Sequence, residues 1–186
     1  NVGVGDPQEG GEGAWGFILA WMRKETPAFV MVAGDLVMGH WGTSKEEIDQ
    51  WAEKYYPPWV GRFKDHGLKV YTALGDHEVG DNPWRGKKAT AVPFYKDAFR
   101  RYLKMPLNGP EHMQGTAFYW RHRNALFVSV DVFEKAPGRQ GEISAQVTGR
   151  QLKWFKEVLK TNRPLVDPIV VMGHTPVLRP AQLGKA

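Results

Sequence analysis

Short apolar runs that end in glycine, followed by an acidic residue or histidine, most limit how this 186-residue chain can fold. The pattern occurs four times, at Gly5-Asp6, Gly34-Asp35, Gly75-Asp76-His77 and Gly173-His174. The continuous apolar run 28–33 is typical of a strand buried on both faces of an α/β sheet, and 169–172 is expected to be a last buried strand. Ligands bind beyond the carboxyl ends of strands in such sheets. The pattern therefore predicts that these polar residues meet on one rim.

The rest of the sequence alternates between strand and helix patterns, so we expect a single α/β domain over residues 1–186. Strands are expected at 2–4, 28–33, 68–74 and 169–172, with a hairpin over 116–130. Helices are expected at 14–24, from 45 onward, at 93–103 and at 149–160. Ser44 and Glu47 form a capping-box pattern, and Pro57 and Pro58 are expected to interrupt or kink the helix that follows. Pro93 is expected in the first turn of its helix.

Composition narrows the chemistry and the partners. The chain has no cysteine, so any metal must be held by histidine, carboxylate, amide or water, which suits Zn, Mn, Fe, Mg or Ni. The net charge of +5 comes from scattered basic residues and indicates a solvated surface rather than a nucleic-acid stripe. No stretch is long and apolar enough to span a bilayer, and no signal-peptide pattern is found at the start. We therefore expect a soluble protein without a membrane partner.

The carboxylates at the strand ends call for a cation. Three converging carboxylates, from Asp6, Asp35 and Asp76, would repel one another and their pKa values would rise. A bound dication reverses that effect and keeps them ionised. Two metal ions that share a carboxylate and a water would also make hydroxide available near neutral pH. The sequence therefore predicts a metal centre.

The order of these motifs, with a last strand that ends in His-x-Pro, resembles the motif series of the calcineurin-like metallophosphoesterases. The stretches 28–37 and 151–159 resemble supporting segments of that family, so the resemblance covers nearly the whole chain. It implies a four-layer α/β/β/α sandwich of two mixed sheets. It also implies hydrolysis of phosphate mono- or diesters by a hydroxide that bridges two divalent metal ions.

The resemblance implies a role for each matching residue. Asp6 would bind the first metal ion and Asp35 would bridge both ions. Asp76 and His174 would bind the second ion. His77 would contact the substrate phosphate and protonate the leaving group.

The sequence also departs from the family pattern. Gln8 stands where the family usually has a histidine ligand, and it is a candidate metal ligand through its side-chain carbonyl oxygen, which binds Zn or Fe more weakly than imidazole does. Asp76 stands in place of asparagine. Met38 replaces the tyrosine that would mark the purple acid phosphatase branch. The final Gly-His-x-His motif is not found. We therefore expect a C-terminally incomplete fragment, which leaves the metal site incomplete and the activity of the fragment itself open.

Several residues have a simpler interpretation beside the functional one. His40 and Arg85 are candidates for substrate contact, although each can be an ordinary loop residue. Asp35 can be a helix N-cap, and Asp6 can belong to a turn before proline. His174 can be a satisfied histidine at a strand end, and Glu78 can support its loop by hydrogen bonding alone.

Asp131 is interpreted as structural. Two rival functions stay open beside the hydrolase that acts on a small phosphate ester. One is a non-catalytic binding or scaffold module on the same fold, because fold does not fix function. The other is a nuclease of the same family, whose binding of DNA would depend strongly on salt.

Overall fold

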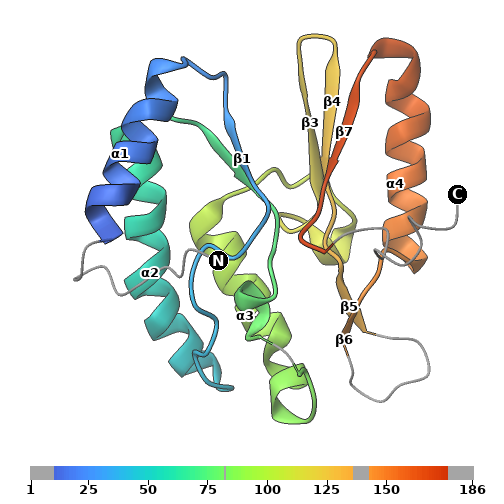
Figure 1. Cartoon of the computed structure of the whole chain (residues 1–186). Coiled ribbons are helices and arrows are strands. Elements are labelled where there is room, and N and C mark those ends of the chain that lie inside the picture. The colour runs from blue at the N-terminus through green and yellow to red at the C-terminus, as the bar shows by residue number, and fades with distance from the viewer. Residues whose placement is uncertain (1–10, 82, 136–142, 176–186) are drawn as a thin grey trace, which may run out of the picture.

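The computed structural model describes residues 11–81, 83–135 and 143–175. Two sheets lie side by side, with helices α1 and α2 beyond one of them and α4 beyond the other (Figure 1). Helix α3 packs against α2. The expected α/β sandwich is confirmed. No helix in these described ranges is long and apolar enough to cross a membrane.

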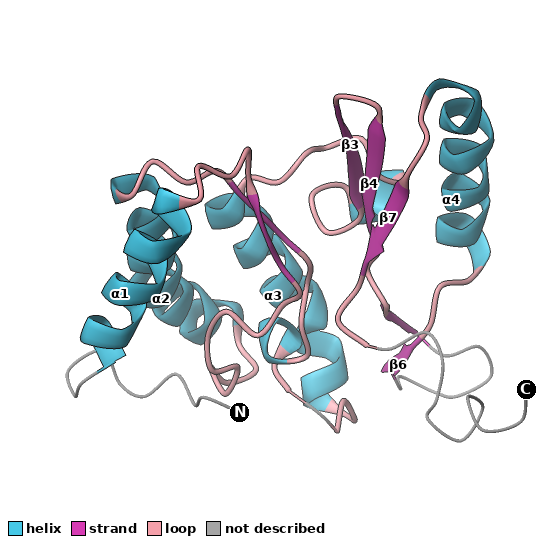
Figure 2. Ribbon diagram, turned by 45° about the horizontal axis from the view of Figure 1, so that its top comes forward, coloured by secondary structure: helices cyan, strands magenta, loops and turns pink. Residues whose placement is uncertain are grey.

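The described residues form four helices, α1 (Gly11–Lys24), α2 (Lys45–Asp65), α3 (Lys87–Leu103) and α4 (Gly149–Asn162). Three short 3-10 turns are η1 (His77–Val79), η2 (Glu111–Met113) and η3 (Arg163–Leu165). The strands are β1 (Val30–Val32), β2 (Val70–Thr72), β3 (Phe118–His122), β4 (Ala125–Ser129), β5 (Phe133–Lys135), β6 (Ile143–Ala145) and β7 (Ile169–Met172). Figure 2 shows how helices and strands separate into layers.

The strand pairing brings three strand ends to one side of the molecule. Strand β1 pairs with β2 in parallel. Strand β4 lies between β3, to which it is antiparallel, and β7, to which it is parallel. A short antiparallel ribbon, β5–β6, follows. Strands β1, β2 and β7 all end toward the lower side of Figure 1, as the sequence pattern predicted.

Aromatic rings hold the two sheets together. The ring of Tyr71, from β2, stacks on Trp120, from β3, with centroids 3.9 Å apart and an interplanar angle of 14°. Phe29 meets the edges or faces of Tyr71, Trp120 and Phe127 at 5.0–5.6 Å. Such pairs add stabilisation beyond the area that they bury. The core between the sheets therefore fixes how their ends are placed.

Helix α2 begins as predicted but continues further than expected. The Ser44 side chain accepts a hydrogen bond from the Glu47 N–H, and the Glu47 carboxylate accepts one from the Ser44 N–H, so the capping box is confirmed. The helix runs through Pro57 and Pro58 to its end, so the expectation of an interruption is wrong, whereas that of a kink stays a prediction. Packing outweighs the local penalty of proline, because one face of the helix is buried from end to end. That face consists of Ile48, Ala52, Tyr56, Trp59 and Phe63.

Three other expectations need correction, and a fourth concerns residues outside the described ranges. Helix α3 begins at Lys87, six residues before Pro93, because Ala89 and Val92 are buried and extend its packed face. Strand β7 was expected to be buried, but it is the edge strand of its sheet among the described residues, and Val170 and Val171 are 39% and 45% exposed. Strand β1 is only half-buried. The strand expected at 2–4 lies outside the described residues.

Candidate metal centre

Three strand ends deliver polar side chains to one place. Strand β1 leads into Asp35, β2 into Asp76 and His77, and β7 into His174. Potential ligand atoms of Asp35, Asp76 and His77 lie within 4.8 Å of one another. The Nε2 atom of His174 lies 3.0 Å from Asp76 Oδ1 and 3.5 Å from Asp35 Oδ1. The predicted convergence is therefore present. Asp6 and Gln8 lie outside the described residues.

Glycines allow the loops after β1 and β2 to approach this closely. Gly34 and Asp35 both have positive φ, 90° and 56°. A Cβ atom on Gly34 would lie 2.6 Å from the Gly75 Cα, and one on Gly75 would lie 2.4 Å from the Asp35 nitrogen. A Cβ on Gly39 would lie 2.0 Å from the carbonyl oxygen of His77. A side chain at any of these glycines would therefore push the two loops apart.

Glu78 fastens the two loops to each other. Its carboxylate is fully buried and accepts backbone N–H groups from Asp35 and Leu36 at 2.8 Å, Gly75 at 2.9 Å and Val37 at 3.3 Å. Successive N–H groups that point at one anion form a nest of partial positive charge. Burial raises the pKa of Glu78 to about 7, although these hydrogen bonds act in the opposite direction. The sequence had suggested support of one loop, whereas the structure shows a link between two.

His174 is oriented as a metal ligand would be. Its Nδ1 lies 2.7 Å from the carbonyl oxygen of Ala33. A carbonyl oxygen only accepts hydrogen bonds, so Nδ1 carries the proton. In the neutral ring the lone pair is then on Nε2, which faces Asp35 and Asp76. A hydrogen bond from the second ring nitrogen to a carbonyl is the usual way to fix a ligating histidine.

The electrostatics of the site reflect crowded negative charge. Burial raises the pKa of Asp35, and its hydrogen bond with Asp76 raises it further. Burial also acts to raise the pKa of Asp76, but the hydrogen bond from Asp35 and the charge of His174 hold it below its ordinary value. Burial opposes the rise in the pKa of His174, which its bond to Ala33 and the two carboxylates produce. Protons held by Asp35 and His174 thus offset negative charge that a bound divalent cation would otherwise neutralise.

The donor set fits a divalent cation. It consists of two carboxylates and two imidazoles, which suit Zn, Mn, Fe, Mg or Ni. The Nδ1 of His77 is buried and has no hydrogen-bond partner among the described residues. Buried polar atoms are rarely left unpartnered, so this atom is consistent with a site for a further group.

The two candidate substrate contacts stay predictions. The His40 Nε2 lies 3.1 Å from Asp81 Oδ2, and the His40 ring lies 6.5 Å from the His77 ring at 85°. The sequence analysis missed Asp81, and its only signal was an acid four residues after His77. Arg85 lies in the loop between η1 and α3, where its N–H donates to the Pro83 carbonyl.

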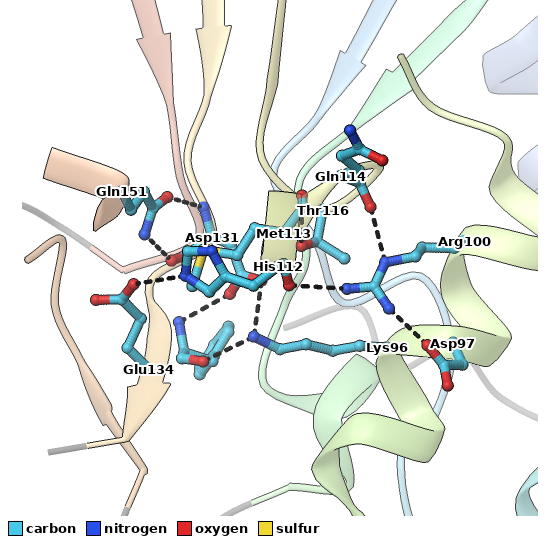
Figure 3. A network of polar contacts seen from close by, with 11 residues as sticks. Lys96, Asp97, Arg100, His112, Met113, Gln114, Thr116, Asp131, Glu134 and Gln151 are labelled. Atoms are coloured by element: carbon cyan, nitrogen blue, oxygen red, sulfur yellow. Dashed lines mark hydrogen bonds and ion pairs between the residues drawn. The ribbon is translucent and has the colours of Figure 1, made fainter. Parts of the chain in front are cut away.

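Asp131 has the structural role that was predicted for it. Its carboxylate is fully buried and accepts hydrogen bonds from the Lys96 ammonium at 2.7 Å and the Phe133 N–H at 3.0 Å (Figure 3). The Gln151 side chain bonds both the N–H and the carbonyl of Asp131. The network joins α3, α4 and the end of β4.

Comparisons with known proteins point to one family. A family model described as calcineurin-like phosphoesterase matches residues 2–184. Among solved structures, a dimetal phosphatase from Danio rerio superimposes with a TM-score of 0.58 at 12% identity. The match covers 91% of this chain and 62% of that one, and at this identity it speaks for the fold alone. A search of curated proteins finds no significant match.

Proposed function

Because the chain belongs to the calcineurin-like phosphoesterase family, we propose that it hydrolyses phosphate mono- or diesters with two divalent metal ions. One observation carries the proposal. Asp35, Asp76 and His174 come from three separate strand ends, and the Nε2 atom of His174 lies 3.0 Å from Asp76 Oδ1 and 3.5 Å from Asp35 Oδ1. Such a set is costly to assemble without a cation.

The proposed ligands divide between two ions. Asp76 and His174 would hold one ion, and Asp35 would bridge both because its carboxylate lies beside each of them. Asp6 and Gln8 would complete the other position. The ion is one of Mn, Zn, Fe, Mg or Ni, since all the donors are oxygen or nitrogen.

The chain's own residues would orient the ester and manage its protons. When bound, the ions would neutralise the phosphoryl oxygens and lower the pKa of a water toward about 7. His77, whose ligand atom lies within 4.8 Å of those of Asp35 and Asp76, would contact the phosphate and protonate the leaving oxygen. His40, held by Asp81 and adjacent to His77, would contact the rest of the substrate. Arg85 would add positive charge to the same rim.

The test combines metal content with hydrolysis. Elemental analysis and Mn²⁺ titration calorimetry of the chain should show bound metal, and nitrophenyl phosphate or bis-nitrophenyl phosphate should be hydrolysed. Asp35→Asn should remove both properties, because a bridging amide neutralises less charge and binds more weakly. Comparison of the two substrates then separates a monoesterase from a diesterase.

The rival functions predict other results. A folded chain that holds no metal and hydrolyses neither substrate would favour the non-catalytic binding module. Binding of DNA that weakens steeply with salt, together with cleavage of DNA, would favour the nuclease.

A further inference from the structure

A cavity lies apart from the metal centre. A cleft of about 550 Å³ opens between α3, η2, β5 and the start of α4. Val92, Pro93, Met113 and Phe133 form its apolar wall. None of the proposed metal ligands that the structure describes lines the cleft, although the Phe133 ring lies 6.2 Å from the His174 ring and so borders both places.

Two of the cations that line this cleft are already paired. The Lys96 ammonium donates to the Asp131 carboxylate at 2.7 Å and to the Phe133 carbonyl at 2.8 Å. The Arg100 guanidinium pairs with Asp97 and donates to two backbone carbonyls of the η2 turn (Figure 3). Neither cation is left to attract a ligand strongly.

Glu134, the one carboxylate among the described residues of the lining, is also engaged. One oxygen of Glu134 accepts the N–H of Thr148 at 3.2 Å and its hydroxyl at 3.0 Å. The other oxygen lies 3.9 Å from the Nε2 of His112 (Figure 3). Since the Thr148 hydroxyl is turned to Glu134, it does not cap α4, and the first turn of α4 contains no acidic residue.

Arg150 is the cation that remains. It is exposed, lines the cleft, and makes no side-chain hydrogen bond or ion pair with another residue in the described ranges. Burial lowers the pKa of His112, and the charge of Arg150 lowers it further. A neutral imidazole can donate one hydrogen bond and accept another. The cleft thus combines one unmatched guanidinium, one neutral histidine and an apolar wall.

We propose that this cleft binds a small organic anion with an apolar body. Its carboxylate or phosphate would pair with Arg150 and accept a hydrogen bond from His112, and its apolar part would lie on Phe133 and Met113. A guanidinium suits such planar or tetrahedral anions because its donors form a fork. The inference does not depend on hydrolysis at the metal centre, because no metal ligand takes part.

The experiment uses 4-fluorobenzoate as the probe and measures its binding by ¹⁹F NMR with a chelator present. The chelator keeps the anion away from any metal ion. Fluorobenzene tests the apolar wall alone, and acetate tests the charge alone. Arg150→Ala should weaken binding about tenfold or more, because it removes a charge-assisted hydrogen bond. His112→Ala should weaken it less, and Arg150→Lys should keep part of the affinity.

Lys156→Ala is the matched control, because Lys156 is an exposed cation on the same helix that does not line the cleft. It should bind 4-fluorobenzoate as the wild type does. Three outcomes would overturn the proposal. The first is that the wild-type chain does not bind 4-fluorobenzoate, and the second is that Arg150→Ala and His112→Ala both bind it as tightly as the wild type does. The third is that fluorobenzene binds as tightly as 4-fluorobenzoate. Circular dichroism confirms that each variant is folded before it is compared.

Discussion

Two carboxylates are fully buried in the described part of the chain, and their surroundings differ. Asp131, at the end of β4, faces the ammonium of Lys96 at 2.7 Å. Glu78, under the loops that carry Asp35 and Asp76, faces only backbone N–H groups. One buried charge has a cation from the chain itself, and the other does not.

The difference indicates which of the two regions would be stabilised by a bound cation. The pair of Asp131 and Lys96 is electrically complete, so this buried charge needs no cation from outside. Glu78 adds negative charge beneath a site already crowded with carboxylates, and burial raises its pKa to about 7. A cation bound above the loops would relieve that excess. Substitution of Lys96, which pairs with Asp131, should therefore affect stability, whereas substitution of Glu78 should affect both stability and metal binding.

The largest effect is expected from Lys96→Met. The variant keeps the volume of the side chain but leaves the Asp131 carboxylate buried without its cation. We expect the free energy of unfolding to fall by about 3–5 kcal/mol, as is typical of broken buried ion pairs. Urea denaturation measures the loss. Addition of Asp131→Asn should recover part of it, and an unchanged midpoint in Lys96→Met would contradict the comparison.

The next effect is expected from Glu78→Gln. The amide keeps one oxygen but turns an NH₂ group toward two of the backbone N–H groups that Glu78 now accepts. We expect a loss of about 2–4 kcal/mol, since each unsatisfied group costs about 1–3 kcal/mol. Mn²⁺ affinity should fall more than about tenfold, because the two loops are no longer held together.

Asp131→Asn is the control for that experiment. It should lower stability without a change in Mn²⁺ affinity, because Asp131 lies outside the site. If Glu78→Gln bound Mn²⁺ as the wild-type chain does, Glu78 would have no part in placing the ligands.

A smaller effect is expected from pH when metal is removed by a chelator. The pKa of Glu78 is about 7 in the folded chain, above its ordinary 4.5, so the folded state binds this proton more tightly. Stability from Glu78 is thus present below about pH 4.5 and is lost as pH rises through about 7. The raised pKa values of Asp35 and His174 act in the same direction, and the lowered pKa of Asp76 acts against them.

Urea denaturation at about pH 5 and about pH 8 measures this change. The free energy of unfolding should be lower at the higher pH, by up to about 3 kcal/mol. The decrease should shrink in Glu78→Gln and persist in Asp131→Asn. A decrease of equal size in Glu78→Gln would show that another group causes it.

The smallest effect is expected from Glu47→Gln, the same chemical change at an exposed carboxylate. Glu47 also accepts backbone N–H groups, from Thr43 and Ser44. Water can replace those bonds, so thermal unfolding should shift much less than in Glu78→Gln. A shift of equal size would mean that burial is not what distinguishes the two carboxylates.

Local signals made much of this fold predictable. The capping box of Ser44 and Glu47 lies within four residues, and the glycines that precede Asp35 and Asp76 mark strand ends directly. Errors arose where packing outweighs a local rule, as at Pro57 inside α2 and Pro93 inside α3.

The sequence predicted that Asp35, Asp76 with His77, and His174 converge, but not the contacts that hold their loops in place. Glu78 binds the N–H of Leu36 across 42 positions, and His174 binds the Ala33 carbonyl across 141. His40 and Asp81 pair across a similar gap to the first. Contacts of this kind leave no periodic trace in a sequence, because they depend on how two loops pack. Asp6 and Gln8 lie outside the described residues, so their roles as metal ligands stay predictions.

The stacked rings of Tyr71 and Trp120 give the molecule a built-in optical reporter. One chromophore comes from each sheet, and their near-parallel stacking at 3.9 Å couples their electronic transitions. The near-ultraviolet circular dichroism of the chain should therefore contain a band that vanishes when the sheets separate. Its loss in Tyr71→Leu would assign the band, and the sheet interface could then be followed during unfolding without an added label.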